Sequence, residues 1–539
     1  MQALLIEYVS LILIILALVM LANRLRLAYP IVLVVGGLTL SLLTQFSNLT
    51  IDPDLVFLLF LPPLLYEAAW QVSWKEFWRF RRVITSFAFP IVILTACVIA
   101  VVSNALIPGF TLALGFLLGG IISPPDAISA TTIMRQVNVP RALVSIAEGE
   151  SLLNDASSLI VFRFALAAVL TGQFSMQQAA VSFGVVVFMG IGVGLLVGAL
   201  FYAIHRWLPT TPAIDIVLTL VTPYCMYYAA EHFHFSGVLA VVSGGLFLSH
   251  KRERLLTYQS RIQGVNVWTN LVFVLNGLVF LLIGLQLPPI VKQLGGVSLG
   301  RAIGYSVAIS VALMATRLLC TFGAVVVTRF MSRFITVADT NPGWRGPLIL
   351  GWAGMRGVVS LAAALSIPLS MGGGQPFPHR NLILFITFVV ILVTLVFQGL
   401  TLPWLIRRVR PDDRDAPLPQ QALQIQQRLV QASIQFLEER LAISPSPNEH
   451  VQNLYERLKI DQKVLRGDLR AEGNPANAPH LAFQRTYLDL LQTQRDLLNA
   501  MNQEAELDED LIRQQLGLID LEEFKIREKR TPQVNNPEV

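Results

Sequence analysis

Three carboxylates and several hydroxyl groups lie in a stretch whose apolar content is otherwise typical of a membrane-spanning helix. The stretch covers residues 148–164, and its polar members include Glu148, Glu150, Ser151, Asn154 and Asp155. Ionisable side chains inside an apolar segment are expensive to bury, so by default they mark an ion or proton pathway. We therefore expect this segment to carry ions as well as to cross a bilayer.

The spacing of these residues gives the predicted helix two functional faces. Side chains four residues apart share a face, so Ser151 and Asp155 lie together, and Glu150 and Asn154 lie on the neighbouring face. An aspartate in a hydrated cavity can bind either a proton or a small cation, and the two ligands compete because burial penalises the bare carboxylate. We interpret Asp155 as the shared carrier of a cation and a proton.

Further oxygen ligands are expected from outside this helix. Carboxylate and hydroxyl oxygens suit a hard alkali cation, so Asp126 from outside the helix and Ser151 from the same face of the helix are the candidates for these ligands. The predicted Na⁺ site therefore consists of Asp155, Asp126 and Ser151. Glu67 is a further candidate, although its place near the predicted cytoplasmic end of a span would also allow it simply to reach water.

Glu150 is better explained as the partner of an arginine within the membrane, because an unpaired buried charge is strongly destabilising. Arg356 is the first choice of partner, and Arg163 and Arg317 are the alternatives. Asn154 could orient that pair or the carrier. A purely structural network of ion pairs is the competing interpretation of the whole cluster, but its acidic residues outnumber its arginines.

The composition divides the chain into two parts. Of 539 residues, 54% are hydrophobic and only 14% are charged, which is typical of a polytopic membrane protein. However, 22 of the 35 Asp and Glu residues lie after residue 410, whereas 25 of the 40 Lys and Arg residues lie within residues 1–410. We predict a transmembrane domain over residues 1–410 and a cytoplasmic helical tail, with a regulatory role, over residues 411–539.

Thirteen apolar runs in the first part are long enough to cross a bilayer. They cover residues 3–22, 29–46, 54–72, 83–107, 110–134, 140–171, 176–204, 213–232, 235–250, 265–288, 297–330, 346–370 and 381–406. Lys and Arg collect in alternate connections, which places the N-terminus outside and the C-terminal tail in the cytoplasm. The first run lacks the basic region and cleavage site of a signal peptide, so we expect it to be retained.

Two of the runs are interrupted. The fifth contains Ser123-Pro124-Pro125-Asp126, and the twelfth contains a glycine cluster around Arg356. Proline removes a backbone donor and disfavours the helical conformation of the residue before it. Broken helices at corresponding places in two halves are typical of transporters built from inverted repeats, where they lie next to the ion site. The fold class that we predict is an all-α polytopic membrane protein with about thirteen transmembrane helices, two inverted repeats and broken crossing helices.

The second part has a different pattern. Leu, Ile and Phe recur at helical spacing, with charged residues between them, at about 420–442, 448–471, 480–503 and 507–529. These segments predict amphipathic soluble helices. No catalytic motif supports an enzymatic tail, and the chain as a whole is expected not to be an enzyme, to need no cofactor and to bind no nucleic acid.

Four motifs follow one another along the first part of the chain, namely Phe-Leu-Pro-Pro-Leu-Leu-Tyr-Glu at 60–67, Ser-Pro-Pro-Asp-Ala at 123–127, Glu-Ser-Leu-Leu-Asn-Asp at 150–155 and Gly-Met-Arg-Gly at 354–357. In this order they resemble the cation:proton antiporter-1 family, which comprises the bacterial and eukaryotic sodium/proton exchangers. The resemblance extends over most of residues 54–406. It implies a homodimer in the plasma membrane that moves a core against a dimerisation domain.

The resemblance also implies roles for single residues. Asp155 would carry Na⁺ or H⁺, Asp126 would lie on the crossing broken helix, and Glu150 would pair with Arg356. Asn154 before the aspartate implies electroneutral exchange of one cation for one proton, because relatives with two adjacent aspartates are electrogenic. Pro125 stands where many members have a hydroxyl residue, so that ligand would come here from the backbone or from water.

The prediction is therefore exchange of Na⁺ for H⁺ by alternating access, with Li⁺ and K⁺ as alternative cations and a K⁺/H⁺ antiporter as the alternative function. A cation channel or uniporter would use the same residues without counter-movement of protons. An intramembrane hydrolase built on Asp126 and Asp155 is disfavoured, since the chain lacks the motifs of such enzymes.

Overall fold

The computed structural model is helical throughout the part of the chain that it describes, apart from one isolated bridge between Ser370 and Pro376. The residues described are 2–25, 27–41, 58–137, 139–172, 176–292, 294, 297–331, 343–371, 375–411, 418–443, 449–466, 479–501 and 509–528. The chain divides into two units, Met1–Asp412 and Asp413–Val539. Each is described by itself below.

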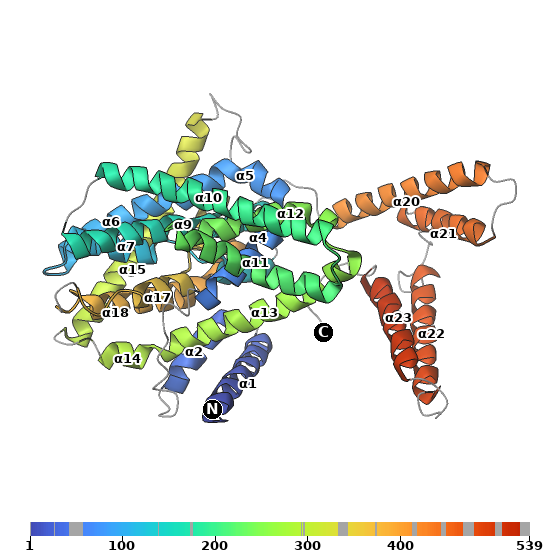
Figure 1. The fold of residues 1–539 in the computed structure, drawn as a ribbon, viewed down its shortest axis with the longest axis horizontal. Coiled ribbons are helices and arrows are strands. Elements are labelled where there is room, and N and C mark those ends of the chain that lie inside the picture. Colours follow the sequence, from blue (N-terminus) through green and yellow to red (C-terminus); the bar gives the residue numbers. More distant parts are fainter. Residues whose placement is uncertain are drawn as a thin grey trace. The chain divides into compact units, whose positions relative to one another are not determined.

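The first unit holds the helices labelled α1 to α19 (Figure 1). They are α1 Gln2–Leu25, α2 Tyr29–Ser41, α4 Leu61–Gln71, α5 Trp74–Ser86, η1 Phe87–Ile91, α6 Val92–Leu106, α7 Leu112–Ile122, α8 Ala127–Gln136, α9 Arg141–Thr171, α10 Met176–Trp207, α11 Pro212–His232, α12 Gly237–Leu255, α13 Tyr258–Leu285, α14 Leu287–Lys292, α15 Leu299–Met331, α16 Arg345–Trp352, α17 Val358–Leu365, α18 Arg380–Val393, η2 Thr394–Gln398 and α19 Gly399–Val409. The elements η1 and η2 are single π-helical turns inside longer helices.

The prediction of an all-helical membrane protein is confirmed. Each of the thirteen expected spans coincides, in its described part, with one helix or with consecutive helical elements; residues 42–46 and 54–57 of two of them lie outside the described residues. Seven helices in the described part are long and apolar enough to cross a membrane, namely Trp74–Leu106, Arg141–Thr171, Val181–Trp207, Pro212–His232, Tyr258–Lys292, Leu299–Phe330 and Arg380–Val409. The number of crossings and the inverted repeat remain predictions.

Both predicted interruptions are present, and they meet. One separates α7 from α8 at residues 123–126, and the other separates α16 from α17 at residues 353–357. The backbone N–H of Asp126 donates to the carbonyl of Met355 at 2.7 Å, so the two breaks are joined by their main chains. A Cβ atom on Gly357 would lie only 2.5 Å from Oδ2 of Asp126, so glycine permits this close approach.

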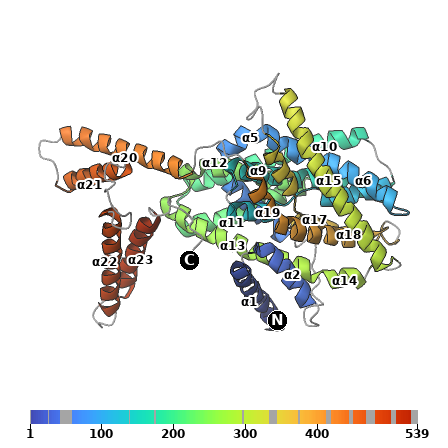
Figure 2. The ribbon, with the colours of Figure 1, turned by 180° about the vertical axis from the view of Figure 1, so that it is seen from behind.

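The remaining long helices hold this crossing in place. α7 packs against both α6 and α9 (Figure 1), and α15 packs against α6 and α18 (Figure 2). The π-helical turn η1 contains Pro90, which cannot donate to the helical ladder. Nearby, the hydroxyl of Ser157 on α9 donates to the carbonyl of Ala88 at 2.5 Å, which ties α9 to the long helix α5–η1–α6.

The second unit consists of two helical pairs. Its helices are α20 Leu418–Ile443, α21 Glu449–Arg466, α22 Pro479–Met501 and α23 Glu509–Glu528. Their bounds lie close to those expected from the spacing of apolar residues. α20 packs against α21, and α22 packs against α23.

Polar contacts accompany both pairs. The Tyr455 hydroxyl donates to Glu438 at 2.8 Å, and Arg495 donates to Asp520 at 2.6 Å and to Glu523 at 2.8 Å.

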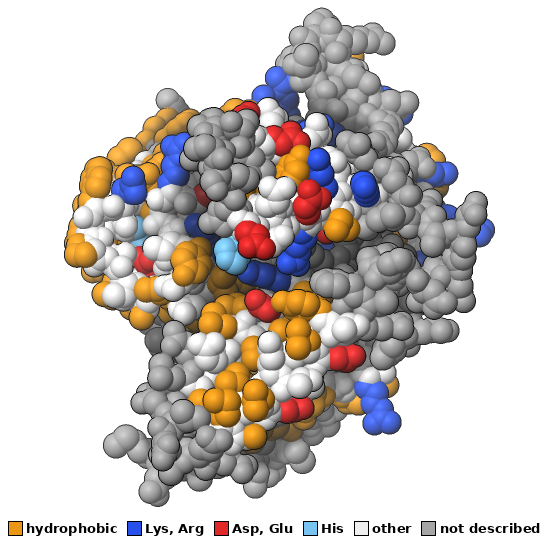
Figure 3. Space-filling model, turned by 90° about the vertical axis from the view of Figure 1, so that its right-hand side faces the viewer, with side chains coloured by type: hydrophobic (Ala, Val, Ile, Leu, Met, Phe, Trp, Pro, Cys, Tyr) orange, Lys and Arg blue, Asp and Glu red, His pale blue; other side chains and the backbone are white. Residues whose placement is uncertain are grey.

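Charged and hydrophobic side chains are interspersed on the face of the molecule seen in Figure 3. The regulatory role of this unit remains a prediction.

Candidate functional site

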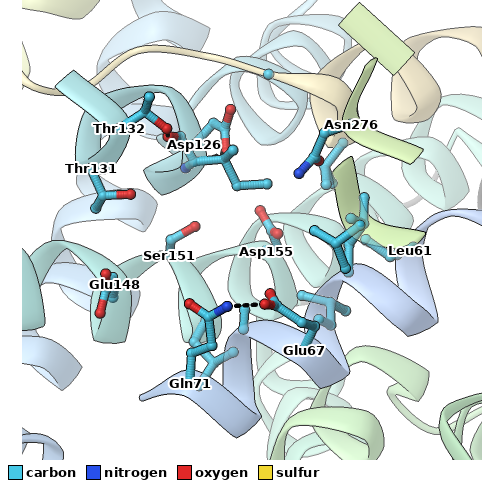
Figure 4. Close-up of a pocket in the computed structure, with 18 of the residues that line it drawn as sticks. Leu61, Glu67, Gln71, Asp126, Thr131, Thr132, Glu148, Ser151, Asp155 and Asn276 are labelled. Carbon is cyan, nitrogen blue, oxygen red and sulfur yellow. Dashed lines mark hydrogen bonds between the residues drawn. The ribbon is translucent and has the colours of Figure 1, made fainter. Parts of the chain in front are cut away.

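A cavity of about 340 Å³ in the first unit brings together side chains from several helices. Its wall is formed by α2, α4, the break before α8, α8 itself, α9, α13, the break before α17 and α17 itself (Figure 4). The polar side chains in this wall are Tyr29, Glu67, Gln71, Asp126, Thr131, Thr132, Arg135, Glu148, Ser151, Asp155, Thr269, Asn276 and Ser360. The sequence-predicted residues Asp155, Asp126, Ser151 and Glu67 are therefore brought to one place.

The long helix α9 has the two faces that its sequence predicts. Ser151 and Asp155 line the cavity, whereas Glu150 and Asn154 are buried outside its wall. Asp155 is only 9% exposed, and among the described residues its carboxylate receives no hydrogen bond. A buried carboxylate without a donor is unstable as an anion, so this group favours a bound proton or cation.

Asp126 is a partly buried carboxylate of a different kind. It is the N-cap of α8, and it accepts hydrogen bonds from the backbone N–H of Ile128 at 3.0 Å and from the Ser129 hydroxyl at 3.2 Å. These donors and the positive end of the α8 dipole stabilise its negative charge. Asp126 is also near enough to Asp155 for their charges to repel each other. Two carboxylates in one cavity, one compensated and one not, attract a mobile cation.

Two further pairs lie along the cavity wall. Glu67 and Gln71, one turn apart on α4, form a hydrogen bond that Figure 4 marks with a dashed line. Arg135 at the end of α8 and Glu148 on α9 form an ion pair at 2.6 Å, with exposed side-chain fractions of 59% and 21%. This second pair belongs to the solvent-facing part of the wall.

Asn154 holds the broken helix against α9. Its side-chain Nδ2 donates to the carbonyl of Pro125 at 2.9 Å. Because Pro125 and Pro124 interrupt the helix, this carbonyl has no helical partner, and the amide satisfies it. Asn154 thereby orients the segment that carries Asp126, while its own position is outside the cavity wall.

The predicted pair of Glu150 and Arg356 is wrong. Glu150 instead binds Arg317 on α15 through two hydrogen bonds of 2.8 and 2.9 Å, and both side chains are buried. This is the planar, bidentate geometry in which arginine binds a carboxylate best. Arg163, the other alternative, pairs with Glu231 at 2.6 Å.

Arg356 has another role. Its guanidinium donates to the carbonyls of Ile122 at 2.8 Å, Ser123 at 3.0 Å and Gly354. The first two are C-terminal carbonyls of α7, which the two prolines leave without helical donors. A cation at the C-terminus of a helix also complements its dipole. Arg356 therefore neutralises a helix end rather than a carboxylate.

Sequence reasoning missed several polar residues of the cavity wall, chiefly Asn276, Thr132 and Gln71. Asn276 is an amide in an otherwise apolar part of α13, 4% exposed. An amide in such a run is a recognisable signal, since buried polar groups need partners. Gln71 is the last residue of α4, where polar residues are common and carry little information. Thr132 lies in the middle of α8, and its hydroxyl donates to the carbonyl of Ile128 at 2.7 Å, as threonines in ordinary helices also do.

The two arginine–glutamate pairs of α9 predict very different effects on stability. Glu150→Gln should lower the free energy of unfolding by about 3–5 kcal/mol, because it leaves the buried Arg317 charge without its carboxylate. Glu148→Gln is the matched control and should cost at most about 1 kcal/mol, because its pair with Arg135 is exposed. Denaturant or thermal unfolding of the purified protein measures both.

A double variant separates the charge effect from packing. Glu150→Leu combined with Arg317→Leu should recover much of the loss, since neither charge is then buried alone. Equal stability of Glu150→Gln and Glu148→Gln would contradict the assignment of the buried pair.

Comparison with known proteins agrees with this geometry. The family model described as "Sodium/hydrogen exchanger, transmembrane" matches residues 10–408. The chain is 31% identical over 468 residues to the sodium, potassium, lithium and rubidium/H⁺ antiporter of Bacillus subtilis, covering 82% of this chain and 69% of that protein. It is 29% identical to the low-affinity Na⁺/H⁺ antiporter NhaS1 of Synechocystis, and the match covers 83% of this chain and 80% of that protein.

The fold is also that of a solved structure. The sodium proton antiporter MjNhaP1 of Methanocaldococcus jannaschii matches with a TM-score of 0.59 and 17% identity, covering 76% of this chain and all of that one. These matches confirm the resemblance that the four motifs indicate. The chain therefore belongs to the sodium/hydrogen exchanger family.

Proposed function

We propose that this protein exchanges Na⁺ for H⁺ across the plasma membrane, with Asp155 binding one ion or the other. The observation that carries the proposal is the contrast between the two aspartates of the cavity. The Asp126 carboxylate accepts hydrogen bonds from Ile128 and Ser129, whereas the carboxylate of Asp155 accepts none from the described residues. Asp155 is therefore the group that needs a mobile partner, and the family supplies the class of that partner.

The same contrast explains how the two fluxes are coupled. During alternating access the site changes the side of the membrane to which it opens, and a bare Asp155 would then be a buried charge without compensation. Binding of a proton or a cation to Asp155 lowers this free-energy cost. The site therefore switches its opening from one side of the membrane to the other only when one of these ions is bound. A channel or uniporter would lack this requirement.

The choice of cation follows from the ligands and from the relatives. The cavity offers carboxylate, hydroxyl and amide oxygens, which are hard ligands for alkali cations. Na⁺ is in the names of both relatives given above, and the Bacillus subtilis protein is also named for K⁺, Li⁺ and Rb⁺. We propose Na⁺ as the principal substrate at Asp155, Asp126 and Ser151, with Li⁺ or K⁺ exchange as the second candidate.

Electroneutral exchange is supported by the position of Asn154. This neutral amide occupies the place next to Asp155 and is engaged with the Pro125 carbonyl. It adds no second carboxylate that could carry an extra proton. One cation then replaces one proton at Asp155, and the cycle moves no net charge.

We further propose a homodimer in which a core that contains the two broken pairs, α7–α8 and α16–α17, together with α9 moves against a dimerisation domain. Their joint movement is supported by the hydrogen bond from Asp126 to Met355 and by Arg356, which binds carbonyls of both segments. The N-terminus outside and a cytoplasmic tail agree with the distribution of Lys and Arg.

Substitution of the carrier tests the assignment. Asp155→Asn should abolish Na⁺-driven proton movement in everted vesicles, because the amide cannot exchange a proton for a cation. The matched control is Asp215→Asn, a buried carboxylate of the same unit outside the cavity wall, bound to His205 and Ser260. This control should keep most of its activity. Full activity in Asp155→Asn would overturn the assignment.

Electroneutrality predicts independence from voltage. In proteoliposomes with the membrane potential clamped by K⁺ and valinomycin, the rate of Na⁺/H⁺ exchange should be the same at zero and at about 100 mV. Moving one net charge would add about 2.3 kcal/mol per 100 mV to the driving force. A rate that changes with the sign of the potential would contradict one-for-one exchange.

A further inference from the structure

Asn276 is the one residue of the cavity wall that presents a buried polar atom without a partner, among the residues that the structure describes. The side chain is 4% exposed, and its Oδ1 has no hydrogen-bond partner there. The other described residues with such atoms are Tyr66, Asn154, Arg317, Thr387 and Gln398, and none of them lines the cavity. Buried polar groups are normally satisfied, so each exception needs an explanation.

The place of Asn276 suggests what satisfies it. It projects from α13 toward the space shared with Asp126 and Asp155 (Figure 4). Those two carboxylates come from the broken helix and from α9, so Asn276 reaches the same space from a third segment. A cation bound between the two aspartates would therefore have the Asn276 amide as a third neighbour.

α13 is held by close packing one to two turns beyond this amide. It packs closely against α2, because Gly37 on α2 touches the backbone at Leu281 and Gly284 on α13 touches the backbone at Val34. Any side chain at either glycine would overlap the opposing main chain. Asn276 thus lies on a positioned helix, which is what a group that selects ions by geometry requires.

The chemistry of an amide fits this position. Its oxygen is a neutral, hard ligand that adds coordination to an alkali cation without changing the charge of the site. A half-turn of its last torsion would offer N–H donors to a carboxylate instead. Asn276 can therefore bind the cation through its side-chain oxygen. When no cation is bound, it can donate a hydrogen bond from its side-chain nitrogen to a carboxylate.

We propose that Asn276 is a specificity-determining residue whose Oδ1 completes the cation site formed by Asp155 and Asp126. This rests on the proposed cation/proton exchange and adds the residue that distinguishes among alkali cations. Because a carboxylate attracts any cation by charge, a neutral ligand at fixed distance discriminates by size.

The test replaces the amide with an apolar side chain of similar size. Asn276→Leu in proteoliposomes should raise the apparent KM for Na⁺ about tenfold, the effect of losing one contact of hydrogen-bond strength. The maximal rate should change much less, and the ratio of KM values for Na⁺, Li⁺ and K⁺ should shift. Asn270→Leu is the matched control, since Asn270 is an exposed asparagine of the same helix outside the cavity wall. It should leave KM unchanged.

A conservative variant and a binding readout exclude a merely structural role. Asn276→Gln keeps a neutral amide oxygen at this position, so its KM for Na⁺ should return toward the wild-type value. Thermal stabilisation of the purified protein by Na⁺ reports binding without transport, and Asn276→Leu should lose most of it. Unchanged KM values with a lower maximal rate in both variants would overturn the proposal. Absence of exchange in the wild type would instead count against the proposed function.

Discussion

The structure of the site depends on how the protein satisfies the carbonyl groups of a helix that cannot continue. Pro124 and Pro125 end α7 inside the first unit, and a membrane offers no water to the carbonyls left behind. Arg356 binds two of these carbonyls, and Asn154 binds a third. These contacts let the chain turn and resume as α8 with Asp126 at its N-terminus. Without them the cavity would have only one aspartate.

This arrangement determines the distribution of charge around α9. Since Arg356 is occupied by a helix end, Glu150 needs another cation, and Arg317 on α15 supplies it in bidentate geometry. The α8 N-terminus likewise compensates Asp126. Within the described part of the chain, Glu150 and Asp126 then have fixed partners, whereas the carboxylate of Asp155 has none. The unbalanced charge is thus a consequence of how the broken helices are stabilised, and it is placed where a cation or proton can neutralise it.

The sequence predicts the parts of this site that follow from periodicity and from backbone chemistry. Helical spacing separates Ser151 and Asp155 from Glu150 and Asn154, and the proline pair marks the first break. The partner of Glu150 could not be predicted in the same way. Three arginines, Arg356, Arg163 and Arg317, are candidates in the sequence. The choice depends on carbonyls that lack hydrogen-bond donors, and these appear only once the break has a three-dimensional form. Asn276 is on a helix far along the chain, so its place in the same cavity wall as Asp155 follows only from the three-dimensional packing of the helices.

The central claim is that Asp155 binds a cation and a proton in competition. Proton release from the purified protein in weakly buffered detergent solution measures this directly. Addition of NaCl to the wild type, against choline chloride as the ionic-strength control, should release up to about one proton per chain, since ligands that share one carboxylate displace each other. Asp155→Asn should release none. Equal release from both proteins, or none from a wild type that is stabilised by Na⁺, would contradict the account.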